Sequence, residues 1–509
     1  MNDRSHLCTP GRHTRREFLK RSALITAGAG FASPWLLDLA RLGAASADDG
    51  YRATVCLFLF GGNDTHNTFI PTDDTSFNTY SAARGGIGVP RSSALTIEPD
   101  GGWASERQMG FAPEMPNLHR LFRSRELAII SNIGTLLQPL DKEGYRNGEP
   151  RPRGNFSHSD SQTFWQTSTT DNPGSGWSGR TADMILDGNG ERSMFTSISV
   201  AGNTLMMQGE TALQYRISDR GVNNLQNSPF YVDRESHGSP FLPADALRDV
   251  MMLQTGGLFA DSYSTLARRS LESADAMAQA LSISDASYGG PLGALFDPPD
   301  GSTNDLRRVM SQLHMVARLI GAGRDVLGLK RQVFFVSMGG FDTHGNQNNR
   351  HPDLLGAIDG GLSRFFDATR VLGAVDEVVT FTASDFSRTL DSNGDGTDHG
   401  WGGHHVVLGG SVDGRRVIGD LPILGIDGPA DVGRGRLVPY HGVDQLASTL
   451  GRWMGVSDSD LSTVAPNIDR FPTRDLGLFR SAAGIVPRGS DMRIDGPSSG
   501  TFDRPLRGG

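Results

Sequence analysis

The chain has 509 residues, with 48 Lys and Arg against 57 Asp and Glu, and its formal net charge is −9. Its hydrophobic fraction of 37% and charged fraction of 21% are ordinary for a globular protein, which argues against a largely disordered chain. The length allows one large domain with insertions or two to three smaller domains.

Residues 1–47 have the three parts of a twin-arginine export signal in the expected order. Arg15 and Arg16 form the charged part, residues 22–31 form an apolar Ala/Gly-rich part, and cleavage after Ala47 fits the A-x-A pattern there. The apolar part is too short and too weakly hydrophobic to span a bilayer comfortably. We expect the Tat translocase as a partner, no stable membrane span after cleavage, and a periplasmic or secreted mature protein. A retained signal anchor and a chance arginine pair on an amphipathic helix are the alternatives.

The mature chain should be acidic. Loss of the signal removes 7 basic and 3 acidic residues, which leaves 41 and 54 and a net charge of −13. Such a chain should repel nucleic acid. Cys8 leaves with the signal and Cys56 lies in an apolar run, so no intrachain disulfide is available. The twin-arginine route carries folded proteins, and one common reason for its use is a metal or cofactor loaded in the cytoplasm.

Buried strands and amphipathic helices alternate along the mature chain. Continuous apolar runs predict strands, and apolar residues spaced three to four apart predict helices. The predicted strands are 53–60, 127–133, 333–337, 377–382 and 405–408, and the predicted helices are 115–123, 306–320, 355–366 and 443–454, with another opening near 157. This alternation predicts an α/β fold, a three-layer α/β/α sandwich with a mostly parallel sheet.

Two stretches depart from that alternation. Residues 186–300 are predicted to be a large insertion or cap, with helices near 244–253 and 263–281. Residues 456–509 form a Gly/Pro/Arg-rich C-terminal segment, which we expect to be partly mobile. The main α/β domain is therefore predicted to cover residues 48–455.

Asp and His follow the predicted strands. Asp342 and His344 follow strand 333–337, and Asp385 follows strand 377–382. The carboxyl ends of parallel strands line a crevice where ligands bind, and Asp and His are the donors that Zn, Mn, Fe or Mg sites use. The predicted metal ligands are Asp64, Asp342, His344, Asp385, His399, His404 and His405. Taken singly, each of these residues could instead be an ordinary polar residue of a loop or a structural histidine.

Two further features are open to alternative interpretations. Residues 391–396 match the opening of a calcium loop, but Gly402 stands where a Glu is expected, so 391–398 could be a weaker calcium site or a plain polar turn. Ser157 and Ser159 could supply a nucleophile at a helix N-terminus, with His158 as a further catalytic candidate, or these residues could simply cap the helix.

Several motifs together resemble a family of exported bacterial proteins, the domain-of-unknown-function family fifteen-oh-one. They are the twin-arginine leader, Phe60-Gly61-Gly62-Asn63-Asp64, His158-Ser159-Asp160-Ser161-Gln162, Phe341-Asp342-Thr343-His344, Ser384-Asp385-Phe386-Ser387-Arg388-Thr389 and Asp398-His399-Gly400. The family is related to the alkaline phosphatase and sulfatase superfamily. The resemblance implies an alkaline-phosphatase-like sandwich that binds up to two divalent metals and transfers phosphoryl or sulfuryl groups.

By position, the resemblance matches Asp64 and Asp385 to carboxylate ligands of that superfamily and Asp342 with His344 to its middle pair. The chain departs from the superfamily pattern because Phe386, not His, follows Asp385, and because the Cys-x-Pro-Ser-Arg motif of sulfatase nucleophiles is missing.

The leading hypothesis is an exported metal-dependent hydrolase acting on a phosphate ester, a sulfate ester or a related bond of a small or polymeric anionic substrate. The alternatives are a non-catalytic periplasmic binding or assembly protein on the same fold and a calcium-stabilised surface protein.

Overall fold

The computed structural model describes residues 50–170, 174–222 and 258–480. The predicted signal with Arg15, Arg16 and its cleavage after Ala47 lies outside these residues, as do the helix predicted near 244–253 and the chain after 480. From Tyr51 onward the described residues belong to one unit of the chain. Within them, no helix combines the length and apolar character needed to cross a bilayer.

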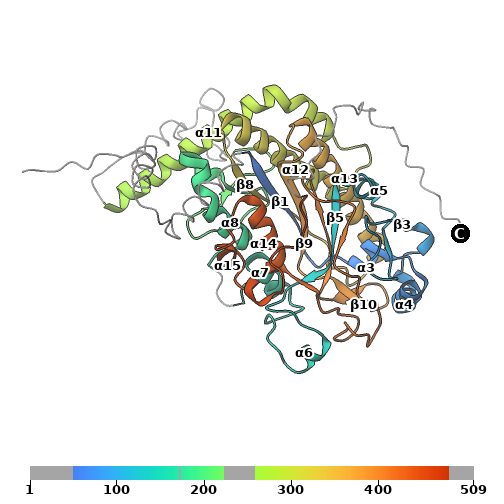
Figure 1. The fold of residues 1–509 in the computed structure, drawn as a ribbon. Helices are drawn as coiled ribbons and strands as arrows, with labels where there is room; N and C mark the ends of the chain where they lie inside the picture. Colours follow the sequence, from blue (N-terminus) through green and yellow to red (C-terminus); the bar gives the residue numbers. More distant parts are fainter. Residues whose placement is uncertain (1–49, 171–173, 223–257, 481–509) are drawn as a thin grey trace, which may run out of the picture. The chain divides into compact units, whose positions relative to one another are not determined.

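A nine-stranded sheet lies at the centre of this unit (Figure 1). Its order is β13-β5-β12-β9-β1-β8-β6-β7, and β14 pairs with β5. Among the described strands of this sheet, β12 alone runs antiparallel to its neighbours. The predicted α/β class with a mostly parallel sheet is therefore confirmed. The strands are β1 (Arg52–Leu59), β5 (Leu127–Gly134), β6 (Ser197–Ser199), β7 (Tyr215–Arg216), β8 (Arg331–Met338), β9 (Val378–Ser384), β12 (Gly403–Leu408), β13 (Val417–Ile418) and β14 (His441–Gly442).

The two faces of the sheet lie in separate apolar clusters, because successive side chains of a strand point to opposite faces. On β1, Val55 and Leu57 pack with residues of α5, α12 and α13. Cys56 and Phe58 pack on the other face with residues of α7, α8, α14 and α15. Helices therefore cover both faces, which gives the three layers.

The long helices agree with the predicted amphipathic segments. In α12, the Thr303 side chain accepts from the backbone N–H of Leu306 at the N-terminus, and the stripe from Val309 to Ile320 is buried. The helices of the two layers are α5 (Pro116–Arg123), α7 (His158–Thr167), α8 (Trp177–Ile185), α11 (Leu258–Leu295), α12 (Asn304–Gly321), α13 (Gln347–Val371), α14 (Val443–Met454) and α15 (Leu461–Val464).

Smaller elements surround the sheet. A three-stranded sheet and a hairpin are made by β2 (Phe69–Pro71), β3 (Leu95–Thr96), β4 (Met109–Phe111), β10 (Arg388–Ser392) and β11 (Thr397–His399). Three short helices are α3 (Thr65–Thr68), α4 (Asp74–Arg84) and α6 (Lys142–Arg146). Short 3₁₀ segments occur at η1 (Gly85–Ile87), η2 (Arg91–Ser93), η4 (Leu205–Met207) and η7 (Ile468–Arg470), a longer kinked one at η3 (Leu186–Phe195), and a π-helical turn at η6 (Ala322–Val326).

Both stretches that departed from the sequence pattern contribute to the main unit. Within the predicted insertion 186–300, β6 pairs with β8 and β7 pairs with β6, so these residues extend the central sheet. After residue 455, Leu461 and Val464 of α15 are fully buried in the cluster that also holds α14. The core therefore continues past the predicted domain boundary.

The carboxyl ends of three neighbouring strands are level with one another. Leu59, the last residue of β1, pairs with Met338 of β8 and with Ser384 of β9. Each strand is followed by a loop that carries polar side chains: Asp342 follows β8 and Asp385 follows β9. The sheet thus brings these loops to one edge.

Candidate metal centre

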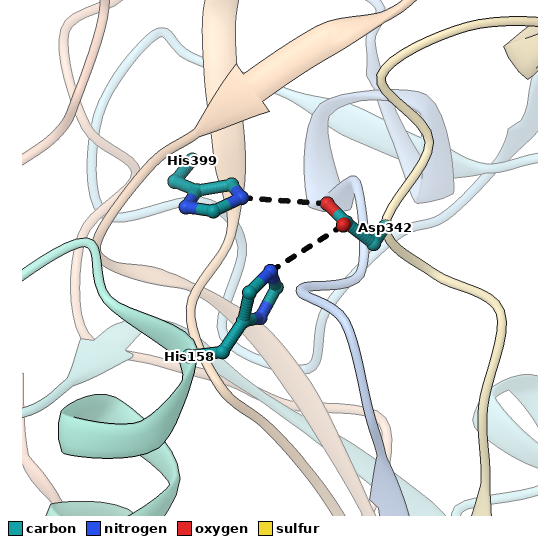
Figure 2. Close-up of side chains that lie close together, drawn as sticks. All are labelled: His158, Asp342 and His399. Atoms are coloured by element: carbon teal, nitrogen blue, oxygen red, sulfur yellow. Dashed lines mark ion pairs between the residues drawn. The ribbon is translucent and has the colours of Figure 1, made fainter.

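Three side chains from different elements converge at this edge (Figure 2). His158 is the first residue of α7, Asp342 lies in the loop after β8, and His399 ends β11. His158 Nε2 lies 3.4 Å from Asp342 Oδ2, and His399 Nε2 lies 3.4 Å from Asp342 Oδ1. One donor atom from each residue lies within 4.8 Å of the others, a spacing that could hold a metal ion.

His344 approaches the same carboxylate. Its Nε2 atom lies 3.1 Å from Asp342 Oδ1 and 3.0 Å from His399 Nε2. The Asp342 carboxylate is therefore faced by the Nε2 atoms of three histidines, His158, His344 and His399.

The opposite nitrogen of each ring has its own acceptor. His158 Nδ1 lies 2.7 Å from Asp385 Oδ2, and His399 Nδ1 lies 2.6 Å from the carbonyl oxygen of Phe156. His344 Nδ1 lies 3.2 Å from Asp398 Oδ1. A neutral imidazole has one donor and one acceptor nitrogen, so a ring that donates from Nδ1 to these acceptors has its Nε2 lone pair free to bind a metal.

In that tautomer the cluster offers three imidazole nitrogens and one carboxylate that face one another, which is a set of metal donors. Imidazole nitrogen and carboxylate oxygen are the donors of zinc and iron sites, and metal-bound histidines ordinarily donate their other N–H to a carboxylate or carbonyl. The residues therefore fit a divalent metal.

The ionisation of the cluster also suits a metal. Burial alone would raise the pKa of Asp342, but Arg388 Nη1, 2.7 Å from Oδ1, holds that pKa below its usual value. Burial lowers the pKa of His399. At neutral pH the carboxylate is ionised and the His399 ring is neutral, which are the forms that bind a metal.

Asp385, predicted as a ligand, lies behind His158. Its Oδ2 atom accepts hydrogen bonds from His158, from Gln162 Nε2 at 2.8 Å and from the backbone N–H of Gly61 at 3.2 Å. Its Oδ1 atom is buried and has no hydrogen-bond partner among the described residues. Burial raises the pKa of Asp385, and its hydrogen bonds from Gln162 and His158 oppose that rise. Asp385 thus contacts the Nδ1 atom of His158, while the Nε2 atom of that ring faces Asp342.

Asp64, also predicted as a ligand, does not join the cluster. It is completely buried and pairs with Arg84, whose side chain is completely buried as well. Arg84 Nη2 lies 2.8 Å from Asp64 Oδ1, and Gln347 donates to Oδ2. Burial alone would raise the pKa of Asp64, but Arg84 lowers it to about 2. Both carboxylate oxygens are thus occupied by a cationic side chain.

His404 and His405 are likewise placed apart from the cluster. They are neighbours on β12, so their side chains point to opposite faces of the sheet. His404 Nδ1 accepts from the backbone N–H of Asn132, and its ring packs edge-on against Phe69. His405 Nδ1 contacts Thr382 Oγ1 at 3.1 Å. Burial lowers the pKa of His404 to about 4 and that of His405 to about 3, so both rings are neutral core residues.

The predicted nucleophiles lie at the edge of the cluster. Ser157 precedes α7 but its side chain makes no capping hydrogen bond, and its Oγ lies 3.1 Å from Ser159 Oγ. In the described part of the chain, neither hydroxyl contacts a carboxylate or an imidazole that could act as a base.

The carboxylates of the predicted calcium loop have protein partners. Arg434 pairs with both Asp391 and Asp398, and Asp395 Oδ2 accepts from the backbone N–H of Asn346 at 2.7 Å. The loop between β10 and β11 is thus stabilised by hydrogen bonds and ion pairs within the protein. Calcium at 391–398 stays a prediction.

Four residues that support the cluster are not among the site residues predicted from the sequence. Gln162 shares the acceptor of His158 and lies four residues further along α7, on the same face, a spacing that could have revealed it. Arg388 stands inside a quoted motif, but nothing in the motif shows its contact with Asp342. Phe156 acts through its carbonyl oxygen and Arg434 through Asp398, and no sequence signal reveals either.

Comparisons with known proteins add a family match. A family model described as "Protein of unknown function (DUF1501)" matches residues 295–465. This match supports the family expected from the motifs. No curated protein matches the chain.

One solved structure is distantly similar to this chain. It is described as "Crystal structure of Ps i-CgsB in complex with k-i-k-neocarrahexaose" and has 9% sequence identity and a TM-score of 0.30, covering 83% of this chain and 77% of that chain. A likeness this weak carries no conclusion about function.

Proposed function

We propose that this chain is an exported metal-dependent hydrolase that acts on a phosphate ester, a sulfate ester or a related bond. The observation that supports the proposal is the convergence of three imidazole Nε2 atoms on the Asp342 carboxylate. Catalytic metal sites use such ligand sets and keep a position open for substrate or water. The side chains of Asp342 and His344 are 44% and 46% exposed, so a substrate could reach the site from solvent.

Each residue has a role in this proposal. His158, His344, His399 and Asp342 would hold the metal, and three imidazoles with one carboxylate favour zinc or iron over magnesium. The bound ion would polarise an ester oxygen and lower the pKa of a water molecule. Asp385 fixes the ring of His158 through Nδ1, which sets the direction of Nε2 before the metal binds.

An anionic ester suits the charges at the site. Arg388 contributes a fixed positive charge next to Asp342, and a divalent ion would add to it. Such a centre attracts phosphate or sulfate groups. We favour water over Ser157 or Ser159 as the nucleophile, because neither described hydroxyl contacts a base.

Metal titration followed by an ester assay tests the proposal. The mature chain, starting at residue 48, would be stripped with chelator, titrated with Zn²⁺ by calorimetry, and assayed on p-nitrophenyl phosphate and sulfate. We expect at least one ion per chain and turnover only in the loaded protein. Asp342→Asn should lower both, whereas His119→Asn, which changes a histidine on α5 that contacts Thr96, should match the wild type.

The outcomes separate the alternatives. A chain that binds metal but turns over no ester in a broad panel would favour the binding or assembly protein. A folded wild-type chain that binds no Zn²⁺, Mn²⁺ or Fe²⁺ would contradict the proposal.

A further inference from the structure

The three histidines of the cluster differ in their exposure to solvent and in the partner of their Nδ1 atom. His158 is held by Asp385, whose side chain is fully buried, and His399 is held by a backbone carbonyl. His344 is the most exposed of the three, at 46%, and its Nδ1 acceptor is Asp398, which is itself 27% exposed. The orientation of His344 therefore depends on what holds Asp398.

Arg434 holds Asp398. Its Nη1 atom pairs with Asp398 Oδ2, and its Nε atom lies 3.2 Å from Asp391 Oδ2. Because the arginine takes Oδ2, the Oδ1 atom of Asp398 is left to accept from His344 Nδ1.

The backbone around Arg434 fixes where its guanidinium can reach. Arg434 has a φ of 60°, and its carbonyl oxygen accepts from the backbone N–H of Asp391 at 3.2 Å. Asp431 Oδ1 accepts from the backbone N–H groups of Gly433 and Gly435, each at 2.7 Å. These contacts do not involve the arginine side chain, so a substitution at 434 should leave the turn in place.

We propose that Arg434 is a positioning residue for the metal centre, acting through Asp398 on His344. The inference rests on the proposed metal site. The Arg434 guanidinium pairs with the Asp398 carboxylate, and that carboxylate accepts from His344 Nδ1. The other nitrogen of the His344 ring faces Asp342. Partners that orient a metal-bound histidine are worth about 10- to 100-fold in metal affinity. Since Arg434 stands one residue further out, loss of its side chain should weaken Zn²⁺ binding by about tenfold.

A double-mutant cycle tests the proposed route. The Kd for Zn²⁺ would be measured by calorimetry for the wild type, Arg434→Gln, His344→Ala and the double variant. Arg434→Gln should weaken binding about tenfold, and the double variant should bind no more weakly than His344→Ala, because the arginine acts only through that histidine. Arg434→Lys should recover part of the loss, since lysine can pair with Asp398 but cannot also reach Asp391 as a planar fork.

The matched control is Arg452→Gln. Arg452 on α14 is 37% exposed, against 42% for Arg434, and also pairs with two carboxylates, Asp458 and Asp475. Its Kd should equal that of the wild type. A salt series adds a readout that needs no change of fold, because the exposed ion pair should make wild-type affinity more salt-sensitive than that of Arg434→Gln.

Two results would overturn the inference while leaving the metal site intact. One is an Arg434→Gln protein with wild-type affinity and salt dependence. The other is a double variant whose loss is the product of the single losses, which would mean that Arg434 acts by another route. A wild-type chain that binds no metal is distinguishable from both, since it contradicts the proposed function itself.

Discussion

Replacing Asp64 by Asn should destabilise the protein without changing its metal affinity. The side chains of Asp64 and Arg84 are both fully buried, and the two carboxylate oxygens face the guanidinium. The pKa of Asp64 is lowered to about 2 by Arg84 in spite of burial, so the pair is ionised at neutral pH. The substitution therefore leaves a buried positive charge without its counter-ion.

The structure sets the size of the effect. Breaking a buried ion pair by removing one partner costs about 3–5 kcal/mol, a large share of the roughly 5–15 kcal/mol by which domains are stable. Asn can still accept from the backbone N–H of His66, as Asp64 does at 3.1 Å, so the cap of α3 adds little to the loss. A second substitution, Arg84→Met, should recover part of the stability because it removes the stranded charge.

Urea unfolding of the wild type, both single variants and the double variant would measure these free energies, and Zn²⁺ calorimetry on folded Asp64→Asn would measure the affinity. An Asp64→Asn protein as stable as the wild type would show that the buried Arg84 does not need Asp64 as its counter-ion. Loss of metal affinity with unchanged stability would do so too, and would favour the ligand role implied by the superfamily resemblance.

Three further predictions concern pH, the backbone and the support of His158. The free energy of unfolding should fall as pH drops from 6.5 towards 4. Burial lowers the pKa of four histidines to about 3 or 4, whereas the same histidines in the unfolded chain bind a proton near pH 6.5. Each of the four should therefore lower the free energy of unfolding by about 1.4 kcal/mol per pH unit in this range. Those histidines are His66, His351, His404 and His405. Burial raises the pKa of Asp359 and Asp444 to about 6, so below pH 6 these two carboxyls bind protons in the folded protein before they do in the unfolded chain, which opposes the loss. A plot of melting temperature against pH should therefore be less steep below pH 6, and a flat plot from 6.5 to 4 would contradict the assignment of four neutral buried histidines. Gly62→Ala should lower the urea midpoint, because Gly62 has a φ of 85° and an added Cβ would lie 2.4 Å from the Phe386 ring; an unchanged midpoint would show that the ring can move. Asp385→Asn should weaken Zn²⁺ binding about tenfold in calorimetry, and an unchanged Kd would show that Asp385 does not orient His158.

The central sheet and main helices could be predicted because their sequence patterns are dictated by burial. The run 53–60 is apolar at nearly every position since β1 is covered on both faces, and helix 443–454 was placed at the observed ends of α14. The last two strands at one side of the sheet, β6 and β7, are only three and two residues long, too short to show a period. They were therefore included in the predicted insertion.

The candidate site was predictable only in part. Asp342 was found because it follows a buried strand, and strand ends meet at one edge of a parallel sheet. Which side chain faces the centre and which stands behind it depends on three-dimensional contacts, so spacing could not separate His158 from Asp385. His404 and His405 were grouped with the ligands by proximity in sequence, but alternation along β12 sends them to opposite faces.

The role of Asp64 could not be predicted from its sequence position either. Its position after β1 matches a ligand position of the resembled superfamily, but the residue that decides its role is Arg84, at the end of α4 twenty residues later. A buried carboxylate needs a cationic or hydrogen-bonding partner, and which residue becomes that partner depends on the three-dimensional fold. The sequence alone does not show that Asp64 pairs with Arg84.

X-ray absorption at the zinc edge, recorded on the zinc-loaded mature chain, would identify the ligands of the proposed centre. We expect nitrogen and oxygen neighbours at about 2.0–2.1 Å, with the multiple-scattering signal of about three imidazole rings. His158→Ala should remove about one ring from that signal. A spectrum of oxygen neighbours without imidazole scattering, or one unchanged in His158→Ala, would contradict the proposed centre.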